Sequence, residues 1–164
     1  MASNDYEFVT NWLIEAPREL VYDILSKGDD LPRWWPDVYL SARLEPSLDG
    51  GDVGTKIHLH TRGWLPYTLR WTAETVRVDR PSGFEIRATG DFDGSGVWHF
   101  DQDGPTTRIR FDWRLRAEKP ILQTLSFALK PIFSWNHRWA MARGLVHLRE
   151  EVARRTTSAH APVA

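Results

Sequence analysis

Apolar and polar residues alternate along most of the middle of the chain. The clearest segment is Arg108 to Ala117, where apolar side chains at every second position alternate with arginines and one aspartate. This period of two is typical of a strand with one buried face. Five similar segments lie between residue 37 and this one, separated by clusters of glycine, proline and aspartate that favour tight turns. We therefore expect six antiparallel strands, the first of which would bury Val38, Leu40, Ala42 and Leu44.

One of these strands changes the parity of its apolar positions. Between Pro66 and Val78, Leu69, Trp71 and Ala73 share one face, but Val76 and Val78 fall on the opposite parity. A β-bulge, which inserts one extra residue, would restore a continuous apolar face. The sequence therefore predicts a bulge in the second half of this strand.

Further elements precede the six strands. The segment 6–15 reads as another strand, and apolar residues at helical spacing follow it over 17–25. Pro17 suits the first turn of that helix and Gly28 its end. The segment 31–36, with two tryptophans between prolines, reads as one irregular turn of helix.

A long helix is expected after the last strand. Its pattern opens at Pro120 and runs to about Arg155, and Pro131 should bend it because proline removes a backbone hydrogen bond. The tail Thr156 to Ala164 is expected to be disordered. The helical positions that repeat every three or four residues are Leu125, Leu129, Ile132, Trp135 or Asn136, Trp139, Ala142 or Arg143, and Val146.

Length and charge limit the classes of protein to consider. The 164 residues fit one domain, assigned to 1–155, and a chain of this length buries roughly 70% of its unfolded surface, enough for a core that holds a cavity. With 21 basic and 22 acidic residues the net charge is −1, so we expect no nucleic-acid partner. The absence of cysteine excludes disulfide scaffolds, thiolate nucleophiles and cysteine-based metal sites. No targeting segment or long apolar run is recognisable, so we expect a cytoplasmic protein without stable membrane insertion.

Aromatic side chains are more abundant than a minimal core requires. Nine Trp, seven Phe and four Tyr make up 12% of the chain. Leu59, Trp71, Phe84, Trp98 and Trp113 fall on the apolar faces of their strands. Either these rings pack against one another as ordinary core, or some of them line a space for a ligand.

The order of elements and several short motifs resemble one superfamily. The order β-α-α-β6-α describes an α+β protein in which a seven-stranded curved antiparallel sheet wraps around a long C-terminal helix. The motifs are Glu15-Ala16-Pro17, Leu31-Pro32-Arg33-Trp34-Trp35-Pro36, Gly51-Asp52-Val53-Gly54-Thr55, Gly90-Asp91-Phe92-Asp93-Gly94 and Met141-Ala142-Arg143-Gly144-Leu145. Together they resemble the START-like, or SRPBCC, superfamily with its Bet v 1-like helix-grip fold, and its polyketide cyclase/dehydrase-like branch.

This resemblance implies a cavity between sheet and helix that binds a lipid, a polyketide or a similar aromatic or isoprenoid molecule. Candidate polar groups in it are Tyr67, Thr61 and Asn136. We expect no cofactor, and a monomer or homodimer. The residues predicted to line the pocket are Trp35, Leu59, Thr61, Tyr67, Leu69, Trp71, Phe84, Ile86, Trp98, Phe100, Phe111, Trp113, Ile132, Trp135, Asn136 and Trp139.

Two other functions remain open beside hydrophobic ligand binding without catalysis. An enzyme that resembles polyketide cyclases or aromatases would fold a reactive chain in the pocket, with Tyr67, His60 or Asn136 assisting proton transfer. A protein-interaction module would need an exposed apolar patch, for which Trp34 and Trp35 are the candidates. The same two tryptophans would equally suit a gate, or ordinary packing of the short helices.

The histidines do not form a recognisable metal site. His58 and His60 share a strand face, but the alternation places both outside the core and no further ligand follows at suitable spacing. His99 is assigned to the outer face by the same alternation. His137 and His147 lie on the long helix and are expected to be partly exposed.

An outer row of arginines has a structural explanation. Glu74, Glu85 and Asp112 are available as partners on the sheet, so a salt-bridged surface is expected. The arginines of this row are Arg108, Arg110, Arg114 and Arg116.

Overall fold

The structure, a computed structural model, describes residues 5–117 and 120–160, with side chains for 5–116 and 130–160. Its order of elements confirms the predicted α+β helix-grip fold. The elements are β1 (Asp5–Ile14), α1 (Arg18–Leu25), the 3-10 turn η1 (Gly28–Asp30), α2 (Leu31–Trp34), β2 (Tyr39–Glu45), β3 (Lys56–Arg62), β4 (Thr68–Asp79), β5 (Gly83–Gly90), β6 (Phe92–Asp103), β7 (Thr106–Ala117) and α3 (Pro120–Ala159).

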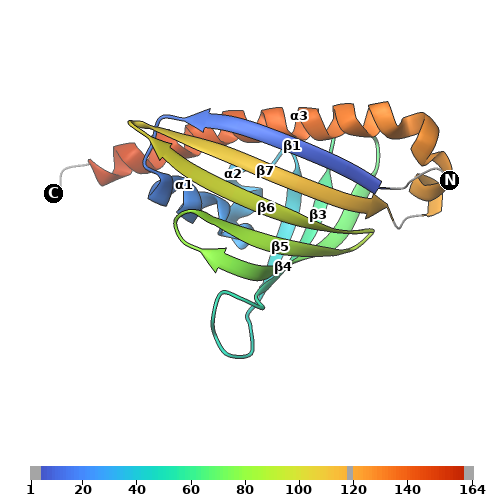
Figure 1. The fold of residues 1–164 in the computed structure, drawn as a ribbon, viewed down its shortest axis with the longest axis horizontal. Helices are drawn as coiled ribbons and strands as arrows, with labels where there is room; N and C mark the ends of the chain where they lie inside the picture. Colours follow the sequence, from blue (N-terminus) through green and yellow to red (C-terminus); the bar gives the residue numbers. More distant parts are fainter. Residues whose placement is uncertain (1–4, 118–119, 161–164) are drawn as a thin grey trace.

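The strands form one curved antiparallel sheet. Its order is β1-β7-β6-β5-β4-β3-β2, so the first strand pairs with the last and the remaining neighbours are consecutive hairpins. Figure 1 shows α3 running along the length of the sheet, with α1 and α2 near the red, C-terminal part of α3. The concave face of the sheet is therefore covered by one long helix and closed at one end by two short ones.

Two register shifts interrupt the sheet. The shift between Thr75 and Arg77 confirms the bulge predicted in β4. A second shift lies between Tyr39 and Ser41 in β2, so Tyr39 pairs with the buried Thr61 and Leu40 is turned to the exposed side. The predicted inner row of β2 is wrong at Leu40 for this reason. It is also wrong at Leu44, which is exposed because β2 is the edge strand of the sheet.

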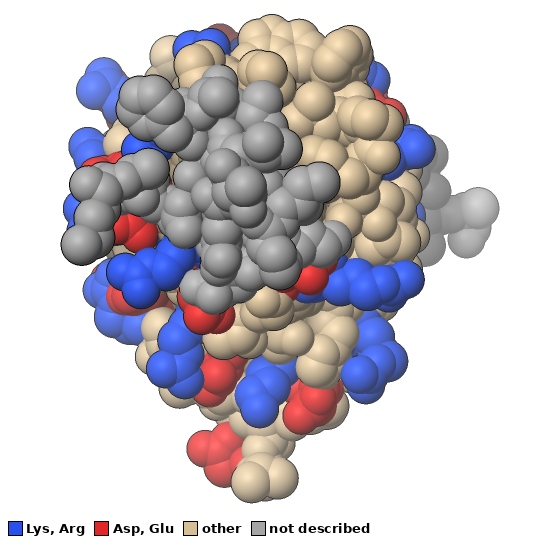
Figure 2. Space-filling model, turned by 90° about the vertical axis from the view of Figure 1, so that its right-hand side faces the viewer, with Lys and Arg blue, Asp and Glu red and all other residues tan. Residues whose placement is uncertain are grey.

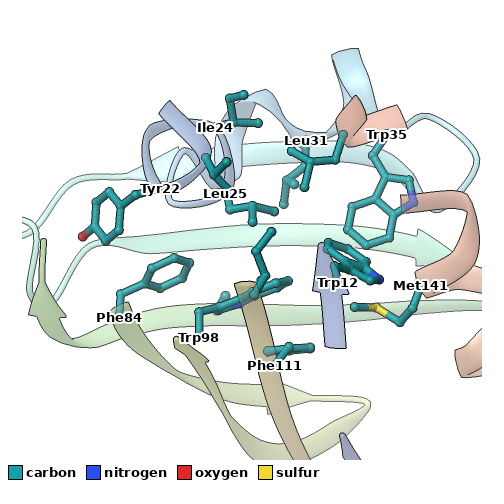
Figure 3. Packing of buried hydrophobic residues seen from close by; sticks show 14 of the residues in the cluster. Trp12, Tyr22, Ile24, Leu25, Leu31, Trp35, Phe84, Trp98, Phe111 and Met141 are labelled. Atoms are coloured by element: carbon teal, nitrogen blue, oxygen red, sulfur yellow. The ribbon is translucent and has the colours of Figure 1, made fainter. Parts of the chain in front are cut away.

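Aromatic rings cover the centre of the concave face. Trp98 stacks on Phe111 with 4.0 Å between ring centroids, and Phe111 stacks on Trp113 at 5.4 Å. A Cβ on Gly96 of β6 would lie 2.7 Å from the Trp113 ring and 2.9 Å from the Phe111 ring. Glycine at this inward position therefore leaves room for rings from β7. Figure 3 shows Trp98 and Phe111 on the side of the core opposite Leu25 and Leu31 of the short helices.

The buried side of α3 differs from the side that its bulky residues indicate. Ile132, Trp135 and Val146 of the predicted repeat are each 42% exposed. A Cβ on Gly144 would overlap the ring of Trp35, so glycine lets the helix approach the aromatic core closely. Predicted positions Leu125 and Leu129 lie outside the described side chains. The buried or half-buried residues of α3 that line the cavity or belong to the core include Phe133, His137, Ala140, Met141, Gly144, Leu148 and Val152.

The two ends of α3 also bear on the sequence predictions. Pro131 lies inside the helix, and Figure 1 shows the orange N-terminal turns at an angle to the rest, as the predicted bend requires. At the other end the helix continues past Arg155 to Ala159, and the hydroxyl of Thr156 donates to the backbone oxygen of Val152. Residues 156–159 are therefore helical, not a disordered tail, and 161–164 lie outside the described residues.

Among the helices described, none is long and apolar enough to span a bilayer.

The outer face of the sheet carries ion pairs, as predicted. Arg110 pairs with Asp112 at 2.9 Å and Arg114 with Glu7 at 3.0 Å. The predicted partners Glu74 and Glu85 instead pair with arginines of β4 and β5. Figure 2 shows basic and acidic side chains interspersed on one end of the molecule. Each of these exposed pairs contributes little to stability.

A buried carboxylate ties α3 to α2. Glu151, which is 4% exposed, accepts hydrogen bonds from Arg33 Nη2 at 2.5 Å, Arg154 Nη2 at 2.7 Å and Arg155 Nε at 2.8 Å. Burial alone would raise the pKa of the Glu151 carboxyl, but the three arginine hydrogen bonds outweigh it and hold this pKa well below its usual range. The cluster anchors the short helices against the long one.

A second polar cluster holds the connection between α2 and β2. Asp37 Oδ2 accepts from Arg143 Nε at 2.5 Å and lies 2.9 Å from His147 Nε2. The backbone oxygen of Asp37 accepts from Arg62 Nε at 3.2 Å. The hydrogen bonds of His147 and Arg143 hold the pKa of the Asp37 carboxyl below its usual range. This connection is therefore joined to both α3 and β3.

Candidate ligand-binding cavity

A cavity of about 240 Å³ remains between the concave face of the sheet and α3. An apolar protein cavity of roughly 150 Å³ is already large enough to bind benzene. The aromatic residues of the sheet therefore leave room for an organic molecule larger than a single ring.

Twelve of the sixteen predicted pocket residues line this cavity, and four do not. Phe100 is fully buried and stacks behind Trp98, away from the open space. Ile132 and Trp135 are exposed because another face of α3 is turned to the sheet, whereas Trp139 packs half-buried against the core without lining the cavity. The twelve that line it are Trp35, Leu59, Thr61, Tyr67, Leu69, Trp71, Phe84, Ile86, Trp98, Phe111, Trp113 and Asn136.

The aromatic residues pack as core and also line the cavity. Trp71, Trp98 and Trp113 line the cavity and also pack against neighbouring rings at centroid distances between 4.0 and 6.3 Å. The rings therefore form a rigid wall as well as a core. A wall of this kind presents flat apolar surface to a guest without the loss of much side-chain freedom.

Trp34 and Trp35 do not form an exposed patch. They are 5% and 2% exposed, and Trp35 packs edge-to-face on Tyr39 at 5.1 Å. This burial excludes the exposed apolar patch that an interaction module would need at this segment, which was one of the alternatives left open. The exposed aromatic pair of the described residues is Trp64 and Trp135, which meet edge-to-face at 4.8 Å.

Asn136 positions the loop between β3 and β4. Its Oδ1 accepts hydrogen bonds from the backbone N–H of Trp64 at 2.7 Å and of Leu65 at 3.2 Å. A Cβ on Gly63 would overlap the Asn136 amide, so a larger residue there would displace this side chain from the loop. Asn136 lines the cavity as predicted, but its carbonyl oxygen is already engaged in holding the loop that carries Tyr67.

His137 is a cavity residue that the sequence analysis did not identify. It is half-buried, as expected, and its ring stacks on Phe8 of β1 with centroids 4.2 Å apart and planes 13° apart. Burial lowers the pKa of His137 to about 4, so the ring is neutral at neutral pH. A neutral imidazole offers one donor and one acceptor nitrogen. No side chain among the described residues hydrogen-bonds to it.

Tyrosine and threonine supply further polar groups. Burial, with a smaller contribution from Tyr6, raises the pKa of Tyr67 to about 12, so this phenol is also neutral at neutral pH. Thr61 Oγ1 accepts from the indole Nε1 of Trp71 at 3.1 Å. His60, proposed above as a proton-transfer group, does not line the cavity. Its neighbour His58 contacts Thr72 and Glu45 on the outer face.

The cavity is nearly free of permanent charge. None of its described lining residues is an aspartate or glutamate, and the one permanently charged residue is Arg62, which is exposed and binds the backbone of Asp37. Within the described part of the chain, no group of three or more His, Asp or Glu side chains is placed to hold a metal ion. The chemistry of the cavity therefore rests on apolar surface and neutral hydrogen-bonding groups.

Known structures share this fold. The Zhui aromatase/cyclase of Streptomyces sp. R1128 superposes with a TM-score of 0.76 at 14% identity, covering 96% of this chain and 99% of that one. Protein TTHA0849 of Thermus thermophilus gives 0.72 at 21% identity, covering 92% and 99%. A START superfamily protein of Mycobacterium smegmatis gives 0.70 at 15%, covering 90% and 97%. At these identities the likeness shows the fold alone.

The sequence itself identifies the family. No curated protein matches the chain. Residues 7–153, however, match the family described as polyketide cyclase/dehydrase and lipid transport, and this stretch includes almost every element that forms the cavity. The chain therefore belongs to the polyketide cyclase/dehydrase and lipid transport family.

Proposed function

We propose that this protein binds a small hydrophobic molecule in the cavity between its sheet and α3. The observation that carries the proposal is an apolar space of about 240 Å³ with a few neutral polar groups in its wall. Burial of about 200 Å² of apolar ligand surface would contribute on the order of 5 kcal/mol before the ordering costs of binding. Membership of a family that covers both lipid transport and polyketide cyclisation supports a guest of this class.

The test fills the cavity from α3. Ala140 lines the cavity and Ala142, two residues further along the same helix, is exposed. We expect Ala140→Phe to weaken binding of N-phenyl-1-naphthylamine, a neutral dye that fluoresces in apolar surroundings, by at least tenfold. Ala142→Phe adds the same ring outside and should leave the dissociation constant within a factor of two.

Melting curves of both variants would show that the fold is retained. Equal affinity in Ala140→Phe, Ala142→Phe and the unaltered protein would mean that the dye binds elsewhere. Failure of the unaltered protein to bind the dye, or to carry any hydrophobic molecule in native mass spectrometry, would count against the proposed function.

An enzyme of the cyclase type is the second candidate, and His137 with Tyr67 is the observation that favours it. A neutral imidazole can accept a proton and a neutral phenol can donate one to a carbonyl group in the cavity. His137 takes the place of His60 in this candidate. With a poly-β-ketone chain as substrate, Tyr67→Phe and His137→Phe should reduce the cyclisation rate by about 100-fold at saturating substrate if the protein is an enzyme. A binding protein would show no cyclisation above the uncatalysed rate in any form.

A further inference from the structure

Several polar groups in the cavity wall lie toward one end. Tyr67 follows the loop that Asn136 holds against α3, and His137 is the next residue on that helix. Tyr6 of β1 lies close enough to Tyr67 to influence its titration, and it stacks on Phe8, which in turn stacks on His137. Two phenols and one imidazole therefore line the cavity between β1, the β3–β4 loop and α3.

The middle and the far end of the cavity are mainly apolar. The indole rings of Trp71, Trp98 and Trp113 form the middle of the wall. Beyond them, next to α1 and η1, the wall includes aliphatic side chains, the ring of Phe84 and two hydroxyls, those of Ser26 and Thr75. The aliphatic residues of this far end include Leu25, Ile57, Ala73 and Ile86.

The polar end favours a neutral group over an ion. A carboxylate placed there would lose its hydration, and the described cations near this end are both exposed: Arg62 donates to the backbone oxygen of Asp37, and Lys130 Nζ lies 5.6 Å from the centroid of the Tyr6 ring. An ammonium group would find no carboxylate among the described lining residues. A hydroxyl or carbonyl group, by contrast, can exchange hydrogen bonds with a phenol O–H and with either nitrogen of a neutral imidazole. Net stabilisation by such a bond corresponds to a few-fold to about tenfold in affinity.

We propose that the guest is an uncharged molecule with a hydroxyl or carbonyl group at one end of an apolar skeleton, and that this group binds next to Tyr67 and His137. The inference rests on the proposed function and adds to it the chemical class and the direction of the guest. Phenols, alcohols and ketones belong to this class of guest, whereas fatty acids do not because they carry a carboxylate.

Three probes of one skeleton test the inference: naphthalene, 2-naphthol and 2-naphthoate, measured by displacement of N-phenyl-1-naphthylamine at pH 7.5. The readout is the dissociation constant of naphthalene divided by that of 2-naphthol. This ratio measures the preference for the hydroxyl group, because the contribution of the shared rings cancels. We expect Tyr67→Phe and His137→Phe each to lower this ratio about three- to tenfold. Naphthoate should bind at least tenfold more weakly than 2-naphthol.

Matched controls remove the same groups outside the cavity. Tyr22→Phe deletes a phenol oxygen from a residue that packs on Phe84 without lining the cavity, and His99→Phe alters an exposed histidine of β6. Both should preserve the ratio. Tyr67→Phe keeps its ring and removes one oxygen, so its result stands even if His137→Phe does not fold.

The outcomes separate the inference from the proposed function. An unchanged ratio in Tyr67→Phe, or a ratio that falls only in Thr75→Val at the far end, would overturn the polar end assigned here. Tightest binding of 2-naphthoate would overturn the uncharged class. If naphthalene and 2-naphthol both fail to bind, the proposed function itself fails, whereas binding of naphthalene with an unchanged ratio contradicts only the further inference.

Discussion

Glu151→Gln is expected to lower the free energy of unfolding by about 3 kcal/mol, because it removes the one carboxylate shared by three arginines. The carboxylate is almost fully buried, so its charge attracts the guanidinium groups with little screening by water. The arginines themselves are partly exposed, which keeps the expected loss at the lower end for a broken buried pair. Urea unfolding at pH 7 would measure it.

Glu150→Gln is the matched control for this prediction. Glu150 precedes Glu151 on α3, has a side chain 68% exposed, and contacts His147 at 3.2 Å. Because exposed ion pairs contribute little, we expect a change below about 0.5 kcal/mol. Equal effects of the two substitutions would show that the Glu151 cluster does not anchor α2 to α3.

His137 is expected to make the protein sensitive to mild acid. Its folded-state pKa of about 4 lies below the ordinary value of 6.5, so the unfolded chain takes up this proton first as the pH falls. Stability is therefore unaffected by this group above pH 6.5, declines between pH 6.5 and 4, and levels off below. The loss attributable to His137 should reach about 3 kcal/mol at pH 4.

The measurement compares free energies of unfolding of the unaltered protein and His137→Phe from about pH 7.5 to 4. The difference between the two curves isolates His137 from the carboxylates that titrate at lower pH. His99→Phe, at an exposed position, should run parallel to the unaltered protein. If His137→Phe also runs parallel, His137 is not held neutral by the cavity, and its proposed contact with an uncharged guest loses its support.

Strand patterning predicted the sheet well for a physical reason. In a sheet with one covered face, burial alternates with every residue, so a sequence with that alternation reveals both the strand and its inner face. Ile109, Phe111 and Trp113 are buried as the alternation in β7 indicates. The parity change at Val76 revealed the bulge in β4, whereas the bulge at Leu40 in β2 left no comparable signal because apolar residues occupy both faces there.

The contact face of α3 could not be read in the same way. Apolar residues lie on several sides of this helix, and the side that meets Trp35 carries Gly144 and Ala140, which contribute little hydrophobicity. The bulky Trp135 therefore suggested the wrong side. The bulky residues therefore indicate Ile132 and Trp139 as pocket residues, whereas the structure places His137 in the cavity wall and these two outside it.

The sequence by itself determined the fold, most of the aromatic wall and the family resemblance, because these depend on alternation and on the order of elements along the chain. Only the tertiary structure decided which side of α3 closes the cavity, that Asn136 is engaged in holding the β3–β4 loop, and that a neutral His137 stacks on Phe8 in the cavity wall. These properties depend on the spatial distance between segments that lie about 70 to 130 residues apart in the sequence. Local periodicity cannot predict such distances, because it reflects only neighbouring residues.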